Sequence, residues 1–165
     1  MRQKVTSRQY STNNCFVCGE NNNYGVGAKF YEIESEEVVC IFNASSEHAG
    51  YPGRLHGGIA SAILDETIGR AILIKEPGTF AVTLELNTQY KKPVPVNQEL
   101  KAIGRLTSIN GRIFEGTGEI LLENGEVAVI AHAKYLKMPI EKIANDSIDA
   151  DRVLYRELDI DEIDL

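Results

Sequence analysis

The segment that decides the fold is Gly53-Arg54-Leu55-His56-Gly57-Gly58-Ile59-Ala60-Ser61-Ala62-Ile63-Leu64-Asp65-Glu66. Apolar residues dominate from its two adjacent glycines as far as Ile74. Pro77-Gly78 then closes the run, because proline cannot continue a helix and glycine readily follows one. The segment therefore predicts a buried helix that starts at about His56 and ends at about Lys75. The charged residues inside it exclude a membrane span.

Strand-like runs lie on both sides of this helix. They are Gly27 to Ile33, Val38 to Phe42, Phe80 to Tyr90, Glu99 to Leu106, Arg112 to Leu122 and Glu126 to Lys137. The first run after the helix alternates in polarity, which puts Thr83 on a polar face and Leu84 on an apolar one. Asn-Gly at 110–111 and at 124–125 joins the last three runs, as tight hairpins prefer. This order of elements predicts a single α+β domain.

Length and charge limit the function classes. The 165 residues are about one domain's worth of chain and can bury a core without disulfides. We expect a loose polar arm over 1–14, the domain over 15–138, and an acidic tail over 139–165 with room for a short helix around 150–158. The tail holds most of the net charge of −7, because nine acids and three bases lie in 141–165. Such a balance excludes a protein that grips nucleic acid through bulk charge.

The cysteines at positions 15, 18 and 40 cannot all pair within one chain. The polar N-terminal segment lacks the apolar run of a signal peptide, so we expect the reducing cytoplasm. Cys15-x-x-Cys18 invites a zinc site with Cys40 and His48 as further ligands. Because that spacing matches no common zinc module, we expect no metal and instead small buried side chains.

Gly57 and Gly58 stand where a helix leaves backbone N–H groups unpaired and carries partial positive charge. A ligand oxygen can approach glycine backbone closely, so this helix start suits a carbonyl that becomes an oxyanion. The alternative is that the glycines only make a tight joint between loop and helix. His56 either fixes the helix entry by bonding to the backbone or polarises the substrate.

An ionised Asp65 in a buried helix is costly unless it is hydrogen-bonded or functional. A structural partner such as Arg70 could satisfy it, or it could serve as a general base that activates water. Asp65 lies seven residues after Gly58, which is about 10 Å along a helix axis. One substrate carbonyl therefore cannot contact both groups of one helix. If the two cooperate, the aspartate comes from a second subunit in a two-fold dimer.

Leu55-His56-Gly57-Gly58, with Asp65 nine residues after the histidine, resembles the hotdog-fold acyl-CoA thioesterases of the PaaI-like type. The run from Thr83 to Pro93 matches their following strand, and Cys15-Phe16-Val17-Cys18-Gly19 is similar to the start of one bacterial branch. The resemblance covers about Cys15 to Met138. It implies a curved antiparallel sheet wrapped around one long central helix, and a homodimer or homotetramer.

By this resemblance, Gly58 N–H, together with Gly57, holds the thioester carbonyl. Asp65 of the partner subunit acts as the general base on water or, less favourably, as a nucleophile. Thr83 stands where members carry a Ser or Thr that positions the aspartate or the water. Some relatives carry Asn or Gln six residues before the histidine, where this chain has Gly50. Either the loop backbone replaces that side chain, or Asp65 and Thr83 act alone.

The resemblance implies an acyl-CoA substrate, hydrolysed to free acid and CoA without a cofactor, and no nucleic-acid or membrane partner. Arginine holds the phosphates of coenzyme A bidentately and lysine holds them as a point charge. The candidate substrate contacts are Arg54, Asn87, Lys91, Lys92, Arg105 and Arg112. Hydration of acyl thioesters on the same fold needs a histidine five residues after the aspartate, where this chain has Arg70. The alternative function is non-catalytic binding or sensing of acyl-CoA.

Overall fold

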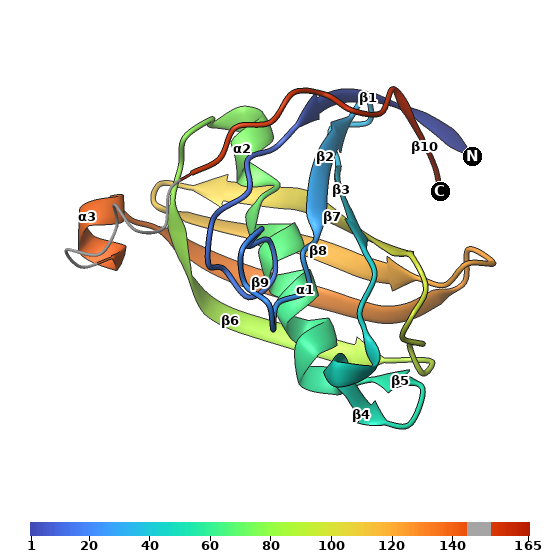
Figure 1. Cartoon of the computed structure of the whole chain (residues 1–165). Helices are drawn as coiled ribbons and strands as arrows, with labels where there is room; N and C mark the ends of the chain where they lie inside the picture. Colours follow the sequence, from blue (N-terminus) through green and yellow to red (C-terminus); the bar gives the residue numbers. More distant parts are fainter. Residues whose placement is uncertain (145–152) are drawn as a thin grey trace.

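The computed structural model describes residues 1–144 and 153–165 as a sheet curved around a central helix (Figure 1). The elements are β1 (Arg2–Arg8), β2 (Lys29–Ile33), β3 (Val38–Phe42), a 3-10 turn (Ser46–His48), β4 (Ala49–Tyr51), β5 (Arg54–Leu55), α1 (Gly57–Gly69), α2 (Ile72–Lys75), β6 (Ala81–Tyr90), β7 (Leu100–Asn110), β8 (Ile113–Leu121), β9 (Val127–Lys137), α3 (Ile140–Ile143) and β10 (Glu162–Asp164). The large sheet is antiparallel, in the order β10-β1-β2-β3-β7-β8-β9-β6. The predicted α+β class is confirmed.

The predicted elements are largely present. Strands β2, β3 and β6 to β9 occupy the six predicted runs, and Gly111 and Gly125 take φ angles of 59° and 80° in the turns between the last strands. The predicted helix over 56–75 is instead two helices. The N–H groups of Ala71 and Leu73 bond to carbonyls three residues back, which tightens the chain between α1 and α2. Within the described ranges, no helix has the length and apolar character that crossing a membrane requires.

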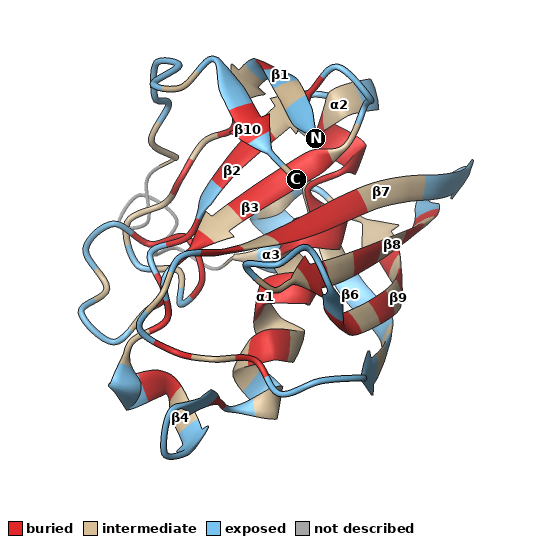
Figure 2. Ribbon diagram, turned by 90° about the vertical axis from the view of Figure 1, so that its right-hand side faces the viewer, coloured by how far each residue is buried: buried red, intermediate tan, exposed pale blue. Residues whose placement is uncertain are grey.

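Helix α1 packs directly on β7 and β8 because glycines there leave room for its backbone. A Cβ atom at Gly104 would lie 2.5 Å from the carbonyl oxygen of Thr67. Cβ atoms at Gly116 and Gly118 would lie 2.6 and 2.8 Å from the Ile68 side chain. The apolar side chains of the helix and of the sheet form one core, and Figure 2 shows the buried residues in red on α1 and on strands such as β3 and β7. The last turns of the helix are therefore fixed against the sheet.

The expected loose arm over 1–14 is wrong, since Gln9 and Ser11 are buried and bond to the domain. Arg2–Arg8 form β1, which pairs with β2 on one side and with β10 on the other. Only one side chain of this strand, Val5, is deeply buried, at 3% exposure. The strand is held by main-chain pairing and by a small cluster in which Val5 packs with Tyr31 and Ile163. The alternating apolar pattern that would have predicted it is therefore missing from the sequence.

The acidic tail returns to the domain rather than extending from it. Its last strand, β10, pairs with β1, so the two ends of the chain lie side by side (Figure 1). Asp159 accepts hydrogen bonds from Arg8 and from Tyr31, both at 2.9 Å. The short helix expected around 150–158 falls partly outside the described residues, and the described part, 153–158, is not helical.

Strand β6 is an edge of the sheet and carries a bulge between Thr83 and Glu85. An extra residue in one strand shifts the alternation of side chains from that point onward. Leu84 is therefore 51% exposed instead of lying on an apolar face, and Thr83 points to α1, where it meets the helix side chains. Beyond the bulge, Tyr90 also faces the helix. The predicted polar face of this strand is thus corrected at Thr83.

Candidate active site

The carboxylate of Asp65 lies between α1 and the edge strand β6. The hydroxyl of Thr83 donates to its two oxygens, at 2.9 Å and 3.1 Å. Behind it, the hydroxyl of Tyr135 on β9 donates to the backbone carbonyl of Asp65 at 2.6 Å. The Tyr135 ring stacks on Phe114, with centroids 4.9 Å apart. The sheet therefore holds both the side chain and the main chain of Asp65.

The structural partner considered for Asp65 is engaged elsewhere. Arg70 donates to Glu66 Oε1 through Nε at 3.0 Å and Nη2 at 2.8 Å, the usual spacing of an ion pair on one helix face. Asp65 accordingly forms no ion pair with any described residue. Burial raises the pKa of Asp65 above its ordinary value, and the Thr83 hydrogen bond partly opposes that rise. A desolvated carboxylate of this kind is a stronger base than one in water.

Asp65 and Thr83 open onto a cavity of about 900 Å³. Its walls come from the N-terminal segment, the second half of α1, helix α2, the start of β6 and the region around α3. The lining residues include Tyr10, Cys15, Cys18, Asp65, Glu66, Arg70, Leu73, Phe80, Thr83, Tyr135, Ile143 and Val153. Its size and its mixture of apolar walls and a few polar groups are typical of a small-molecule site.

The start of α1 is capped by His56. The ring nitrogen Nδ1 accepts from the N–H of Gly58 at 2.9 Å, which satisfies one of the open donors of the first turn. His56 thus makes the backbone contact that was one of its two expected roles. The Gly58 N–H expected to hold a carbonyl is consequently occupied. The N–H of Gly57, by contrast, has no acceptor among the described residues.

Tyr90 lies beside the same helix start, a contact that the sequence did not reveal. Its hydroxyl donates to the carbonyl of Gly57 at 2.7 Å and lies 2.7 Å from Ser61 Oγ. The ring also fills the space beside Gly57, where a Cβ atom would lie 3.4 Å from it. An aromatic residue near the end of a strand gave no local signal of this, because the bulge after Thr83 is what turns Tyr90 towards the helix.

Gly50 packs against the histidine that caps the helix. A Cβ atom at Gly50 would lie 3.2 Å from the Cα atom of His56. A side chain at this position would therefore press on His56, and one of the two segments would have to give by a few tenths of an ångström. The absence of such a side chain fits the close contact between β4 and the helix entry.

The two halves of the expected site are at different places in one chain. Asp65 lines the cavity, whereas Gly57 and Gly58 do not contribute to its walls. Gly58 is exposed at the opposite end of the helix. A single chain therefore presents a carboxylate at one point and an open helix N-terminus at another.

The candidate phosphate-binding side chains differ in whether a carboxylate already pairs with them. Arg105 is held by Glu119, through two bonds of 2.6 Å, and by Glu37. Lys92 pairs with Glu126 at 2.5 Å. The others lie on the surface without an ion pair to the described part of the chain; they are Arg54, Lys91 and Arg112. Asn87 is exposed on β6.

Comparison with known proteins identifies the family that this arrangement resembles. Residues 52–129 match the family described as the thioesterase superfamily. Acyl-coenzyme A thioesterase THEM4 of Rattus norvegicus is 33% identical over 85 residues, which cover 52% of this chain and 36% of that protein. The chain spans less than two thirds of the length of the first curated relatives that it matches.

Solved structures agree on the fold. A thioesterase superfamily protein, RHA08564, superposes with a TM-score of 0.68 at 26% identity, covering 74% of this chain and 59% of that one. The Escherichia coli PaaI protein of the phenylacetic acid degradation operon superposes with a TM-score of 0.62 at 14% identity, covering 69% and 81%. The resemblance to the PaaI-like thioesterases and the predicted hotdog fold are confirmed.

Proposed function

Because residues 52–129 match the thioesterase superfamily and the domain has the hotdog fold, we propose that this chain is an acyl-CoA thioesterase. It hydrolyses an acyl-CoA to the free acid and CoA. The observation that carries the proposal is Asp65: a partly buried carboxylate without an ionic partner among the described residues, held by Thr83 at the wall of a cavity. Burying a carboxylate without an ionic partner costs folding free energy, so such a group at the wall of a cavity indicates a functional role.

In the proposed mechanism, Asp65 acts as the general base. Its carboxylate takes a proton from a water molecule as the water oxygen attacks the thioester carbonyl. The Thr83 hydroxyl fixes the orientation of the carboxylate. When the tetrahedral intermediate collapses, the carbon–sulfur bond breaks and the proton on Asp65 passes to the departing CoA sulfur. Direct attack by Asp65 as a nucleophile is the less favoured route.

The negative charge on the carbonyl oxygen is stabilised at the start of α1. The free N–H of Gly57 donates to it, and the Gly58 N–H shares its hydrogen between His56 and the oxyanion. These donors are fixed in the fold before the substrate binds, which is what makes such stabilisation effective. His56 accordingly acts through the helix start, as a positioning residue.

The site is completed by a second copy of the chain. Because Asp65 and Gly58 are seven residues apart, about 10 Å along the helix, the helices of two subunits must run antiparallel to bring the groups together. Two identical sites then form in a two-fold dimer. Strand β6 supports this, because it ends the sheet with an unpaired edge and exposes Leu84. A tetramer would be built from such dimers.

The phosphates of coenzyme A bind to the unpaired basic side chains. Arg54 lies three residues before the proposed oxyanion donors, and Lys91 follows β6 directly. Both are exposed, as is Arg112 in the turn between β7 and β8. Lys92 and Arg105 contribute less, because carboxylates already neutralise them.

Release of free thiol from short, long and aromatic acyl-CoAs tests the proposal. The Asp65→Asn variant should lose turnover by about 100-fold or more, as removal of a general base predicts. Glu123→Gln is the matched control, because it makes the same chemical change at an exposed site in the turn between β8 and β9 and should retain full activity. If folded, dimeric wild-type protein released no free thiol from any acyl-CoA tested, the proposed thioesterase activity would be refuted.

The capping of Gly58 by His56 favours a second candidate, a non-catalytic acyl-CoA binding protein. In that case the helix start already has its acceptor and serves only the fold. Calorimetry would then detect acyl-CoA binding by wild type and by Asp65→Asn alike, with no thiol released by either.

A further inference from the structure

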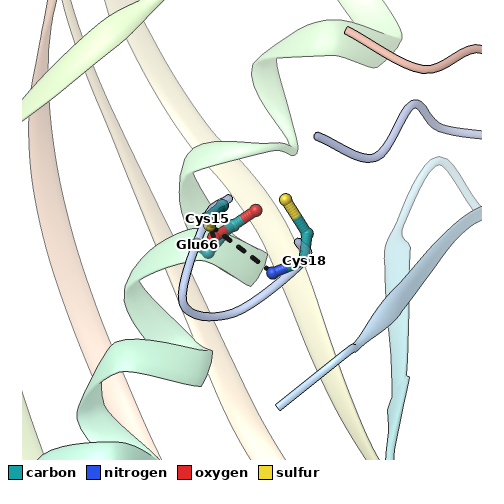
Figure 3. Close-up of side chains that lie close together, drawn as sticks. All are labelled: Cys15, Cys18 and Glu66. Carbon is teal, nitrogen blue, oxygen red and sulfur yellow. Dashed lines mark hydrogen bonds between the residues drawn. The ribbon is translucent and has the colours of Figure 1, made fainter. Parts of the chain in front are cut away.

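A second group of reactive side chains lies beside Asp65 and has no part in the proposed reaction. Cys15 and Cys18 lie on the N-terminal segment, and Glu66 projects towards them from α1 (Figure 3). One potential ligand atom from each residue lies within 4.8 Å of the other two. All three residues line the same cavity as Asp65.

The turn that carries the cysteines is organised around the first sulfur. The N–H groups of Val17 and Cys18 point at Cys15 Sγ, at 3.3 Å and 3.5 Å (the second is the dashed line in Figure 3). The N–H of Gly19 donates to the Cys15 carbonyl at 2.9 Å. A Cβ atom at Gly19 would lie only 2.3 Å from that carbonyl oxygen, so the turn requires glycine. Backbone donors converging on one sulfur favour its thiolate form.

The Glu66 carboxylate is also held in a fixed orientation. Arg70 holds Glu66 Oε1, which leaves Oε2 directed at Cys15 Sγ, 3.2 Å away. The guanidinium carbon of Arg70 lies 4.2 Å from the centroid of the Phe30 ring and 4.7 Å from that of Tyr10, so its position is fixed on both faces. A carboxylate oriented by a second partner is what metal sites commonly use.

We propose that Cys15, Cys18 and Glu66 bind one divalent metal ion of the zinc type. Zinc bonds of about 2.3 Å to sulfur place two tetrahedral thiolates about 3.8 Å apart, and the three ligand atoms here lie within 4.8 Å of one another, so small side-chain movements would bring them to one ion. Metal binding would displace the thiol protons, and the two thiolates with Glu66, set against Arg70, would then carry two negative charges, which a divalent ion cancels. Three protein ligands leave the fourth position open towards the cavity.

This site differs in its ligands from the zinc site considered from the sequence, in which Cys40 and His48 would join the two cysteines. Cys40 is fully buried in β3. His48 Nε2 lies 2.8 Å from the carbonyl oxygen of Tyr24, and its Nδ1 accepts from Ser45 N–H at 3.0 Å. Neither residue belongs to the cluster. Glu66, on a helix 48 residues after Cys18, supplies the third ligand instead, and spacing in the sequence could not reveal it.

The ion would fasten the N-terminal segment to α1 one residue after Asp65. It therefore holds a wall of the cavity in place, and it does not depend on the proposed thioesterase function. Its role is that of a positioning element, whatever ligand the cavity accepts.

The test is to strip the full-length protein with a chelator, keep it reduced, load it with zinc and measure bound metal by atomic emission. About one ion per chain is expected. Loading with Co²⁺ instead should produce the near-ultraviolet charge-transfer bands of cobalt–thiolate bonds. Cys15→Ser and Cys18→Ser should lose these bands, whereas Cys40→Ala, which changes the cysteine outside the cluster, should keep them.

Two results would overturn the inference. One is a reduced wild-type protein that binds neither zinc nor cobalt, with Cys15 and Cys18 recovered as free thiols or as a disulfide. The other is a Cys15→Ser/Cys18→Ser double variant, folded by circular dichroism, that still binds one ion. The wild-type cobalt spectrum decides the matter even if a variant does not fold. Thiol release plays no part in these measurements, so failure of the thioesterase proposal would leave the result interpretable.

Discussion

The Thr83 hydroxyl donates to both carboxylate oxygens of Asp65, at 2.9 Å and 3.1 Å, across the junction of β6 and α1. The contact depends on the bulge that follows Thr83 in the strand. Without that extra residue, one set of alternate side chains would face the helix along the whole strand, and either Thr83 or Tyr90 would point away from it. The bulge in β6 therefore allows Thr83 to contact Asp65 and Tyr90 to contact the start of α1.

Replacing Thr83 tests what this hydrogen bond does. Thr83→Val keeps the shape and removes the donor, and we expect kcat to fall by about 10-fold because the carboxylate loses its fixed orientation. Thr83→Ser retains the hydroxyl and should retain most of the activity. Both variants are compared by steady-state thiol release. Activity kept in Thr83→Val but lost in Thr83→Ser would show that the methyl group and not the hydrogen bond matters.

The pH dependence follows from the burial of Asp65, which raises its pKa. A general base must be ionised, so the acid limb of kcat/KM should lie above the ordinary pKa of an aspartate. In Thr83→Val the limb should move further up, because the bond that favours the charged form is gone. A limb at the ordinary aspartate value in wild type would contradict this assignment.

The same shift makes a prediction about stability. A carboxyl group whose pKa is raised in the folded state lowers the stability of the folded protein as pH rises from the ordinary pKa to the raised one, and the full loss is present above the raised pKa, because the folded state disfavours the charge. Asp65→Asn should therefore unfold at a higher temperature than wild type at neutral pH. The difference should shrink as pH falls through the raised pKa towards the ordinary value. Calorimetry across this range measures it, and a variant less stable at neutral pH would refute it.

Mixed dimers test whether the site is shared. Gly57→Pro removes the free N–H at a position in the first helical turn that accepts proline, and Gly57→Ala keeps it as the control. Loss of one such donor should lower kcat by about 100-fold. Refolding Gly57→Pro with Asp65→Asn should then restore about one quarter of wild-type activity, because half of the dimers contain one intact site. No recovery in verified heterodimers would contradict a site shared between two subunits.

Substitutions of the candidate phosphate-binding residues should differ in their effect on KM. Arg54→Ala and Lys91→Ala should raise KM for acyl-CoA with little change in kcat, because phosphates far from the thioester bind equally in the ground and transition states. The effect should weaken at high salt. Arg105→Gln should leave KM unchanged, since Glu119 already engages that side chain. Larger effects at Arg105 would contradict this order.

Much of the fold could be predicted because its signals are local. Apolar residues from Ile59 to Ile74 indicate the helix, and the two Asn-Gly dipeptides mark hairpins. Strand β1 escaped prediction because its stability comes from main-chain pairing and only Val5 is deeply buried. A strand that is stabilised mainly by main-chain hydrogen bonds need not show the alternating apolar pattern from which strands are predicted.

The site was predictable only in part, for a similar reason. Asp65 and Thr83 carry recognisable chemistry, and the structure brings them together. The pairing of Arg70 with Glu66 rather than Asp65 follows from their spacing of four residues on one helix face. The sequence does not show that Tyr10 and Phe30, from the N-terminal segment and β2, pack on the guanidinium group, because that contact is tertiary.

The glycines beneath α1 have an evolutionary consequence. With no side chains between helix and sheet at Gly104, Gly116 and Gly118, the helix cannot be raised, tilted or rotated by point mutation without clashes. The carboxylate that the helix carries is thus held at a fixed place relative to the sheet. The opposite walls of the cavity come from the N-terminal segment and the region around α3, which pack less deeply. Substitutions there could enlarge, shorten or reshape the pocket while the reacting groups stay in place, so selectivity can diverge without risk to the chemistry.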